Sequence, residues 1–188
     1  MKKTLSLSLP ALALVMFARH ADAQTTVPRR VVGFGLSFGL GVDHNNRGET
    51  RLWPLLPALT LNVPLSQRVE IELWVPVSNL ILADTNAVKG WMWFDVSARW
   101  YPLRASSGLF VQAGVGFMHG HFNDDPSFTV LRVPARVGWE FSRSRIVGFQ
   151  VGVRPWLDVV IPAADIPVGT RLGFVFELGW NFYVTRGP

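Results

Sequence analysis

Hydrophobic and small or polar positions alternate along residues 31–43, whose sequence is VVGFGLSFGLGVD. Successive side chains of a β-strand point to opposite faces, so an alternation with a period of two predicts a strand. The even positions of this segment are large and apolar, whereas the odd positions from 33 on are glycine apart from Ser37 and Asp43. The segment therefore predicts a strand with one apolar face and one nearly bare face.

The same alternation returns in seven later segments, which makes eight in all. Eight segments of about ten alternating residues are the sequence signature of a small transmembrane β-barrel. The connections after the first, third, fifth and seventh segments are longer than the others, as expected of an up-and-down barrel with both termini in the periplasm. The later segments span residues 52–63, 69–77, 91–101, 109–118, 129–141, 147–159 and 172–184.

The apolar face of each segment is predicted to lie on the outside of the barrel. It carries five to seven residues per strand, and an eight-stranded barrel has an interior only just wide enough for side chains to fill. The opposite face is rich in glycine and in charged residues, which suits a crowded interior. A soluble barrel or sandwich, with the apolar face inward, is the alternative that the alternation by itself leaves open.

The inward face of this barrel carries six acids and five arginines. Such charges must pair inside a barrel, because an isolated buried charge is costly, and the planar fork of arginine suits carboxylates. The predicted interior charge network consists of Glu70, Glu72, Asp95, Arg99, Arg132, Arg136, Glu140, Arg154, Asp158, Arg171 and Glu177.

Large aromatic residues on the outward face fall near the periplasmic ends of the strands. Aromatic rows at this height are typical of membrane interfaces. The predicted lipid-facing aromatic girdle consists of Phe34, Trp100, Trp139, Phe141, Phe149, Trp180 and Phe182.

The N-terminal residues 1–23 predict a secretory signal peptide. Two lysines precede an apolar run over residues 5–17, and small residues at 21 and 23 mark a cleavage site. The run is too short to cross a bilayer as a helix, which takes about 20 apolar residues. We expect residues 24–30 to form a periplasmic lead-in and residues 31–185 to form one outer-membrane β-barrel domain.

Charge and composition narrow the partners of the exported chain, residues 24–188. Its 15 basic and 12 acidic residues are dispersed, and no basic run predicts a nucleic-acid partner. Its single lysine, Lys89, stands against fourteen arginines, whereas surfaces in water usually carry many lysines. The absence of cysteine excludes a lipid-modified N-terminal cysteine and a thiolate metal site.

In this pattern of strands, connections and aromatic rows, the chain resembles the small OmpA/OmpX-type outer-membrane barrels over residues 31–185. The resemblance implies an all-β fold, an eight-stranded antiparallel up-and-down transmembrane β-barrel in the outer membrane of a Gram-negative cell. It also implies the lipid bilayer and the outer-membrane insertion machinery as partners. We expect the barrel to be a monomer.

For function, the pattern favours a structural or membrane-integrity barrel whose interior is plugged by ion pairs, although a fold does not decide a function. A narrow pore or transporter for small or apolar solutes is the alternative. It draws on inward glycines of the first and fifth strands, which could leave a slot, and on prolines within strands, which could weaken a seam. Surface recognition and lipid modification are further options. The short outer connections and the lack of a catalytic constellation argue against them, so we expect no enzyme activity.

Two sets of residues could bind a ligand. Five large side chains with inward parity could fill the slot or line a ligand site, and they are Trp74, Phe110, Met118, Trp156 and Tyr183. Histidines and acids of the outer connections could ligate a metal, and they are Asp43, His44, His119, His121, Asp124 and Asp125. Their spacing is unlike that of zinc sites, so we expect neither a metal nor a cofactor.

Overall fold

The computed structural model describes residues 29–186 except 47, 78–83, 86–87, 104–107, 123–126, 142–145 and 162–168. For strand residues 29, 51, 53–56, 84–85, 88–91 and 121–122 the backbone alone is described. The predicted signal peptide and most of the predicted lead-in lie outside the described residues. Among the described residues, no helix is long and apolar enough to span a bilayer.

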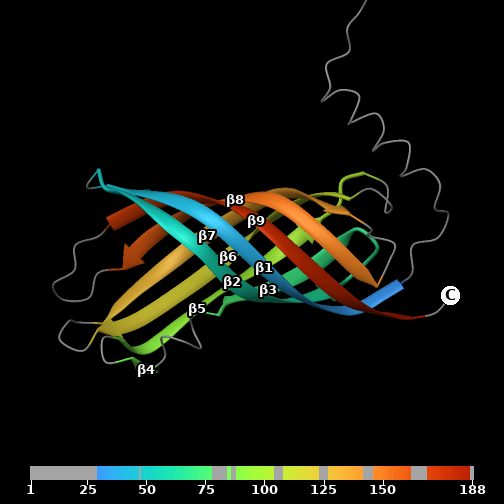
Figure 1. Cartoon of the computed structure of the whole chain (residues 1–188), viewed down its shortest axis with the longest axis horizontal. Helices are drawn as coiled ribbons and strands as arrows, with labels where there is room; N and C mark the ends of the chain where they lie inside the picture. Colours follow the sequence, from blue (N-terminus) through green and yellow to red (C-terminus); the bar gives the residue numbers. More distant parts are fainter. Residues whose placement is uncertain are drawn as a thin grey trace, which may run out of the picture.

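Eight long antiparallel strands and one short strand make up the described chain (Figure 1). They are β1 (Arg29–Asn45), β2 (Thr50–Pro64), β3 (Val69–Pro76), β4 (Asp84–Thr85), β5 (Val88–Trp100), β6 (Leu109–Phe122), β7 (Phe128–Phe141), β8 (Val147–Ile161) and β9 (Gly169–Arg186).

The long strands close into a barrel. Sequential strands are neighbours, β1 pairs with β9, and β3 pairs with β5, so the sheet has no open edge between its eight long members. The two-residue β4 pairs only with the start of β5. This arrangement confirms the predicted eight-stranded antiparallel up-and-down β-barrel.

We call the two ends of the barrel the turn end and the loop end. The start of β1, the end of β9 and the short β2–β3 turn lie at the turn end, on the right of Figure 1, whereas β4 lies at the loop end. The β2–β3 turn covers residues 65–68. The Ser66 hydroxyl oxygen accepts hydrogen bonds from the backbone N–H groups of Arg68 and Val69, at 3.1 and 3.0 Å, and holds this turn tight.

The barrel is polar inside and apolar outside. Among the described residues, 19 buried residues are polar or charged and nine are hydrophobic, while 29 large hydrophobic side chains are exposed. The alternation in β8 shows the cause, because Arg154, Trp156 and Asp158 are buried and the residues between them are exposed. An interior that is more polar than the exterior is the reverse of a water-soluble domain.

Several strands extend beyond the predicted segments, mainly at the loop end. Residues 44 and 45 lie beyond the predicted segment 31–43, but they continue the ladder of β1 with β9, where Asn45 pairs with Arg171. At the turn end, β1 begins at Arg29, so the strand includes two arginines that the sequence assigned to the lead-in. Backbone pairing does not require apolar side chains, and hydrophobic alternation therefore marks only the middle of these strands.

Candidate functional site: the barrel interior

The charged residues predicted to face inward from the alternation of the strands lie in the interior of the barrel. Ten of the eleven predicted network residues are buried, and the eleventh, Arg171, is partly exposed at the loop end. Arg171 Nη1 lies 3.6 Å from the carboxylate of Asp43, a buried residue that the sequence assigned to a loop. The strand alternation thus brings acids and arginines from most of the strands into one volume.

A cluster that we call the turn-end clasp closes the interior next to the start of β1. Arg30 Nη2 donates a hydrogen bond to Glu140 at 2.7 Å, and Arg30 Nη1 lies 3.4 Å from Glu70. The Tyr101 hydroxyl donates to Glu140 at 2.5 Å, and the Arg30 guanidinium carbon lies 3.5 Å from the centre of the Tyr183 ring. One arginine thereby ties β1 to β3 and β7 across the barrel.

Arg30 was missing from the predicted network because the sequence assigned it to the lead-in, and a bulge also changes the face on which its side chain lies. The register between β1 and β9 shifts between Arg30 and Val32, so one extra residue of β1, Val31, separates them. An extra residue rotates the preceding side chain to the other face of the sheet. Arg30 is therefore buried, although its even number would place it on the apolar face of β1. The alternation of apolar and polar residues does not show where a bulge occurs.

In the middle of the barrel, Glu72 is the acceptor for several cations. Its carboxylate forms an ion pair with Arg99 and lies 3.1 Å from Arg154 Nη2 and 3.8 Å from Arg136 Nη1. Gln112 Nε2 donates a further hydrogen bond to it at 2.8 Å. Glu72 is fully buried, so its negative charge is balanced by these neighbours and not by water.

The arginines around Glu72 reach further acids on other strands. Arg154 Nε donates to Glu177 on β9 at 3.0 Å, and Arg154 Nη1 lies 3.5 Å from Asp95 on β5. Arg136 Nη2 lies 3.4 Å from the same Glu177. The middle of the barrel is therefore crossed by a connected set of ion pairs.

Towards the loop end, Arg132 and Asp158 form a bidentate pair. Arg132 Nε and Nη2 donate to the two carboxylate oxygens of Asp158 at 2.6 and 2.8 Å. The guanidinium carbon lies 4.4 Å from the Trp93 ring centre and 5.0 Å from that of Trp156, within the range of cation–π attraction. Trp93 and Trp156 therefore both pack beside this guanidinium. Trp93 was not among the inward residues predicted to fill or line a slot, although its odd number has inward parity in β5.

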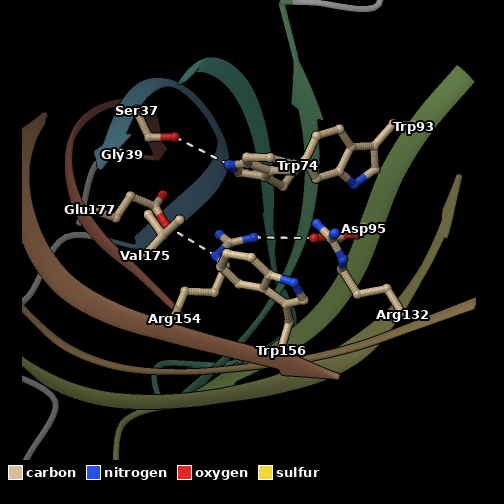
Figure 2. A pocket seen from close by; sticks show the side chains of 10 residues that line it. All are labelled: Ser37, Gly39, Trp74, Trp93, Asp95, Arg132, Arg154, Trp156, Val175 and Glu177. Carbon is tan, nitrogen blue, oxygen red and sulfur yellow. Dashed lines mark hydrogen bonds and ion pairs between the residues drawn. The ribbon is translucent and has the colours of Figure 1, made fainter. Parts of the chain in front are cut away.

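A small pocket remains between these groups and is lined mainly by aromatic and charged side chains. Figure 2 shows Trp74, Trp93 and Trp156 around it, and Arg154 joined to both Glu177 and Asp95. The cavity volume is about 30 Å³. One water needs about 10–15 Å³, so the pocket has room for two or three waters.

The slot that the inward glycines of β1 and β6 could have left is filled by side chains at the glycines described below. Neighbouring side chains occupy the space above these glycines, and a Cβ atom at Gly33 would lie 2.6 Å from the ring of Tyr183. Asn181, Val175 and Asp95 similarly stand over glycines of β1 and β6. The glycines leave room for large neighbours. Consistent with this, all five inward residues expected to fill or line a slot are buried: Trp74, Phe110, Met118, Trp156 and Tyr183.

The seven residues of the predicted aromatic girdle all lie on the outer surface towards the turn end. Phe34, Trp100, Trp180 and Phe182 are exposed, and the other three are partly exposed. Phe34 and Phe182 are direct cross-strand partners. A continuous row runs from Phe141 through Phe149 to Trp180, with ring centres 5.8 and 5.3 Å apart.

The candidate metal ligands do not form a cluster within the part of the chain that the structure describes. The side chains of His121, Asp124 and Asp125 lie outside that part. Of the others, Asp43 pairs with Arg171, and His44 and His119 contact Thr50 and Thr129 through their Nδ1 atoms. No group of three potential metal ligands occurs among the described residues.

The turn-end clasp should contribute measurably to stability. Replacing Arg30 with alanine leaves the buried Glu70 and Glu140 without their shared cation, and hydrogen bonds to charged groups contribute about 1.5–3 kcal/mol. We expect Arg30→Ala to lower the free energy of unfolding by about 2 kcal/mol or more, measured by urea titration in neutral lipid vesicles. Arg68→Ala, at an exposed arginine of the same end, is the control. Equal stability of the two variants would contradict a role for the clasp.

Comparison with known proteins gives similarity in fold and none in sequence family. No family model matches the chain, and no curated protein matches it. Neisserial surface protein A is similar in structure, with a TM-score of 0.53 and 9% identity over 81% of this chain and 97% of that chain. Ail of Yersinia pestis gives a TM-score of 0.45 at 10% identity, covering 82% and 99% of the two chains. OprG, an outer membrane protein of Pseudomonas aeruginosa, gives 0.42 at 10% identity, covering 85% and 99%.

The similarity to Neisserial surface protein A agrees with the closed sheet described above. The chain has the fold of the small eight-stranded outer-membrane barrels, as its resemblance to the OmpA/OmpX type predicted.

Proposed function

We propose that this protein is an integral outer-membrane β-barrel with a mainly structural role, whose interior is sealed by ion pairs. The observation that carries the proposal is the connected set of charged contacts from the turn-end clasp through Glu72 to Arg132 and Asp158. A barrel filled in this way supports no continuous water path and presents its apolar surface to lipid.

The outer surface supports insertion into a bilayer. Contiguous apolar patches on soluble monomers rarely exceed a few hundred Å², whereas exposed apolar residues here occur on every long strand that the structure describes except β3. Val115 and Val133, in the middle of β6 and β7, are 67% and 55% exposed. Hydrocarbon is the solvent that fits such a surface, and a closed barrel leaves no strand edge unpaired within it.

The charge content of the interior supports sealing. With Arg171 included, seven acids and six arginines of the described residues face the interior, so the charges nearly cancel. A near-balanced interior in which each arginine contacts at least one acid does not need mobile counterions. We therefore favour the plugged barrel over the narrow pore. The filled positions above the inward glycines support the same choice.

Export by the signal peptide, delivery to the insertion machinery and a monomeric state belong to this proposal. Fractionation of cells, with recovery of the protein in the outer-membrane fraction and a gel mobility that changes on heating, would support them. Recovery in the soluble periplasmic fraction would contradict membrane insertion.

Single-channel recording tests the sealed interior. Folded wild-type protein in a planar bilayer is expected to give no conductance steps in molar potassium chloride. The double variant Arg154→Ala/Glu177→Ala removes one acid and one base from beside the pocket, preserves the net charge, and is expected to introduce small steps. Regular steps from the wild-type barrel would contradict the proposal and favour the pore.

A structural role should also be visible in the permeability of the cell envelope. Loss of the protein is expected to increase sensitivity to detergents and to large hydrophobic antibiotics. Complementation should restore resistance with the wild-type chain. Unchanged envelope resistance, together with loss of uptake of one small solute, would instead favour a transporter.

A further inference from the structure

The two ends of the barrel differ in charge. At the turn end, Arg68 and Arg186 are exposed and make no ion pair among the described residues. The acids near this end, Glu70 and Glu140, are buried and already bind Arg30. The loop end is mixed, with the exposed Glu49 as well as arginines.

The sequence of the β2–β3 turn agrees with this contrast, because residues 65–68 contain Arg68 and no aspartate or glutamate. Arg29 is the direct cross-strand partner of Arg186.

We propose that the turn end binds the phosphate headgroups of anionic phospholipids through Arg68 and Arg186. This inference rests on the proposed insertion into a membrane. Arginine binds phosphate well because its planar fork can donate two parallel hydrogen bonds. The two guanidinium groups supply the positive charge. The neighbouring aromatic girdle holds this end of the barrel at the level of the lipid headgroups.

The height of both arginines favours a lipid over a soluble anion. Arg68 directly precedes Val69, whose cross-strand partner is the exposed girdle residue Trp100. Arg186 follows Phe182 by four residues, about 13 Å along the strand at 3.3 Å per residue. Aromatic girdles lie at the level of the headgroups, and a long arginine side chain can fold back towards that level. The tight β2–β3 turn keeps Arg68 close to the bilayer surface.

Native mass spectrometry of the folded barrel tests this binding. The protein in a neutral detergent receives equal amounts of phosphatidylglycerol and phosphatidylcholine, and the lipids retained per barrel are counted. The wild-type barrel is expected to prefer phosphatidylglycerol. Arg68→Gln/Arg186→Gln should reduce that preference about tenfold, because each arginine near an anionic surface contributes appreciably to attraction. Salt at about 0.5 M should weaken the preference, since it screens exposed charges.

The matched control removes two charges from the chain between the end of β1 and the first residues of β2. Arg47→Gln/Arg51→Gln is expected to keep the wild-type preference for phosphatidylglycerol. Equal preference in Arg68→Gln/Arg186→Gln and wild type, with both folded, would overturn the inference. Binding of soluble polyphosphate that depends on Arg68 and Arg186, without preference for phosphatidylglycerol, would also overturn it and identify a soluble anion. Failure of membrane insertion is a separate result, because it appears as recovery of the protein, wild type included, in the soluble periplasmic fraction.

Discussion

Replacing Glu72 with alanine is expected to lower the free energy of unfolding by about 3–5 kcal/mol, the usual cost of breaking a buried ion pair by removing one partner. Glu72 is fully buried and is shared by Arg99, Arg136 and Arg154. Without its carboxylate, three guanidinium groups remain close together in a volume with little room for water. Repulsion among them adds to the loss of their hydrogen bonds.

The measurement is a urea titration in neutral lipid vesicles, with the heat-sensitive gel shift as readout of the folded barrel. Glu49→Ala removes an exposed carboxylate at the loop end and should change stability by less than about 1 kcal/mol. Glu72→Gln keeps the size of the side chain but removes its charge, and it should resemble Glu72→Ala if charge is the main contribution. A Glu72→Ala barrel as stable as wild type would show that Glu72 is not required to hold the interior together.

An arginine in place of Val115 should cost about 2–4 kcal/mol, as expected for a cation facing lipid at the midplane of a barrel. Val115 lies in the middle of β6 and is 67% exposed. In water, a substitution at such an exposed position would be nearly neutral. The loss of stability in Val115→Arg therefore shows whether hydrocarbon or water surrounds the middle of β6.

Leu65 provides a matched control because it is 65% exposed but lies in the β2–β3 turn. Leu65→Arg should cost no more than about 1 kcal/mol, since the penalty falls away towards the interface. The same urea titration compares the two variants. Equal costs for Val115→Arg and Leu65→Arg would mean that no hydrocarbon layer surrounds the middle of the barrel, and would contradict membrane insertion.

The fold and the direction of most interior side chains could be predicted from sequence because both depend on a period of two. Arg99, Arg132 and Glu177 alternate with apolar neighbours, and that alternation decides which face they share. The partners of each charge depend on strand stagger, which no local pattern encodes. Sequence could therefore place Glu72 inside but could not identify the three arginines around it.

Two other features were inaccessible for different reasons. The inward position of Arg30 depends on a bulge at Val31, and one inserted residue leaves no mark in composition or alternation. The glycines of β1 appeared to predict free space, because a glycine pattern does not show how far Tyr183 and Val175 extend from the neighbouring strand. Both cases concern contacts between strands, whereas alternation describes a single strand.

The charged interior also bears on how the first and last strands find their correct alignment. β1 and β9 pair over almost their whole length, from Arg29 with Arg186 to Asn45 with Arg171. A slip of one residue in β9 would exchange its two faces, turning Glu177 and Asn181 towards lipid and Phe176 and Trp180 inward. Such a misaligned barrel would expose a charge to hydrocarbon and leave Arg154 and Arg136 without an acid on that strand. The interior ion pairs therefore favour the correct register when the barrel closes. Backbone hydrogen bonds alone could form equally well in a register shifted by one residue, whereas the ion pairs could not.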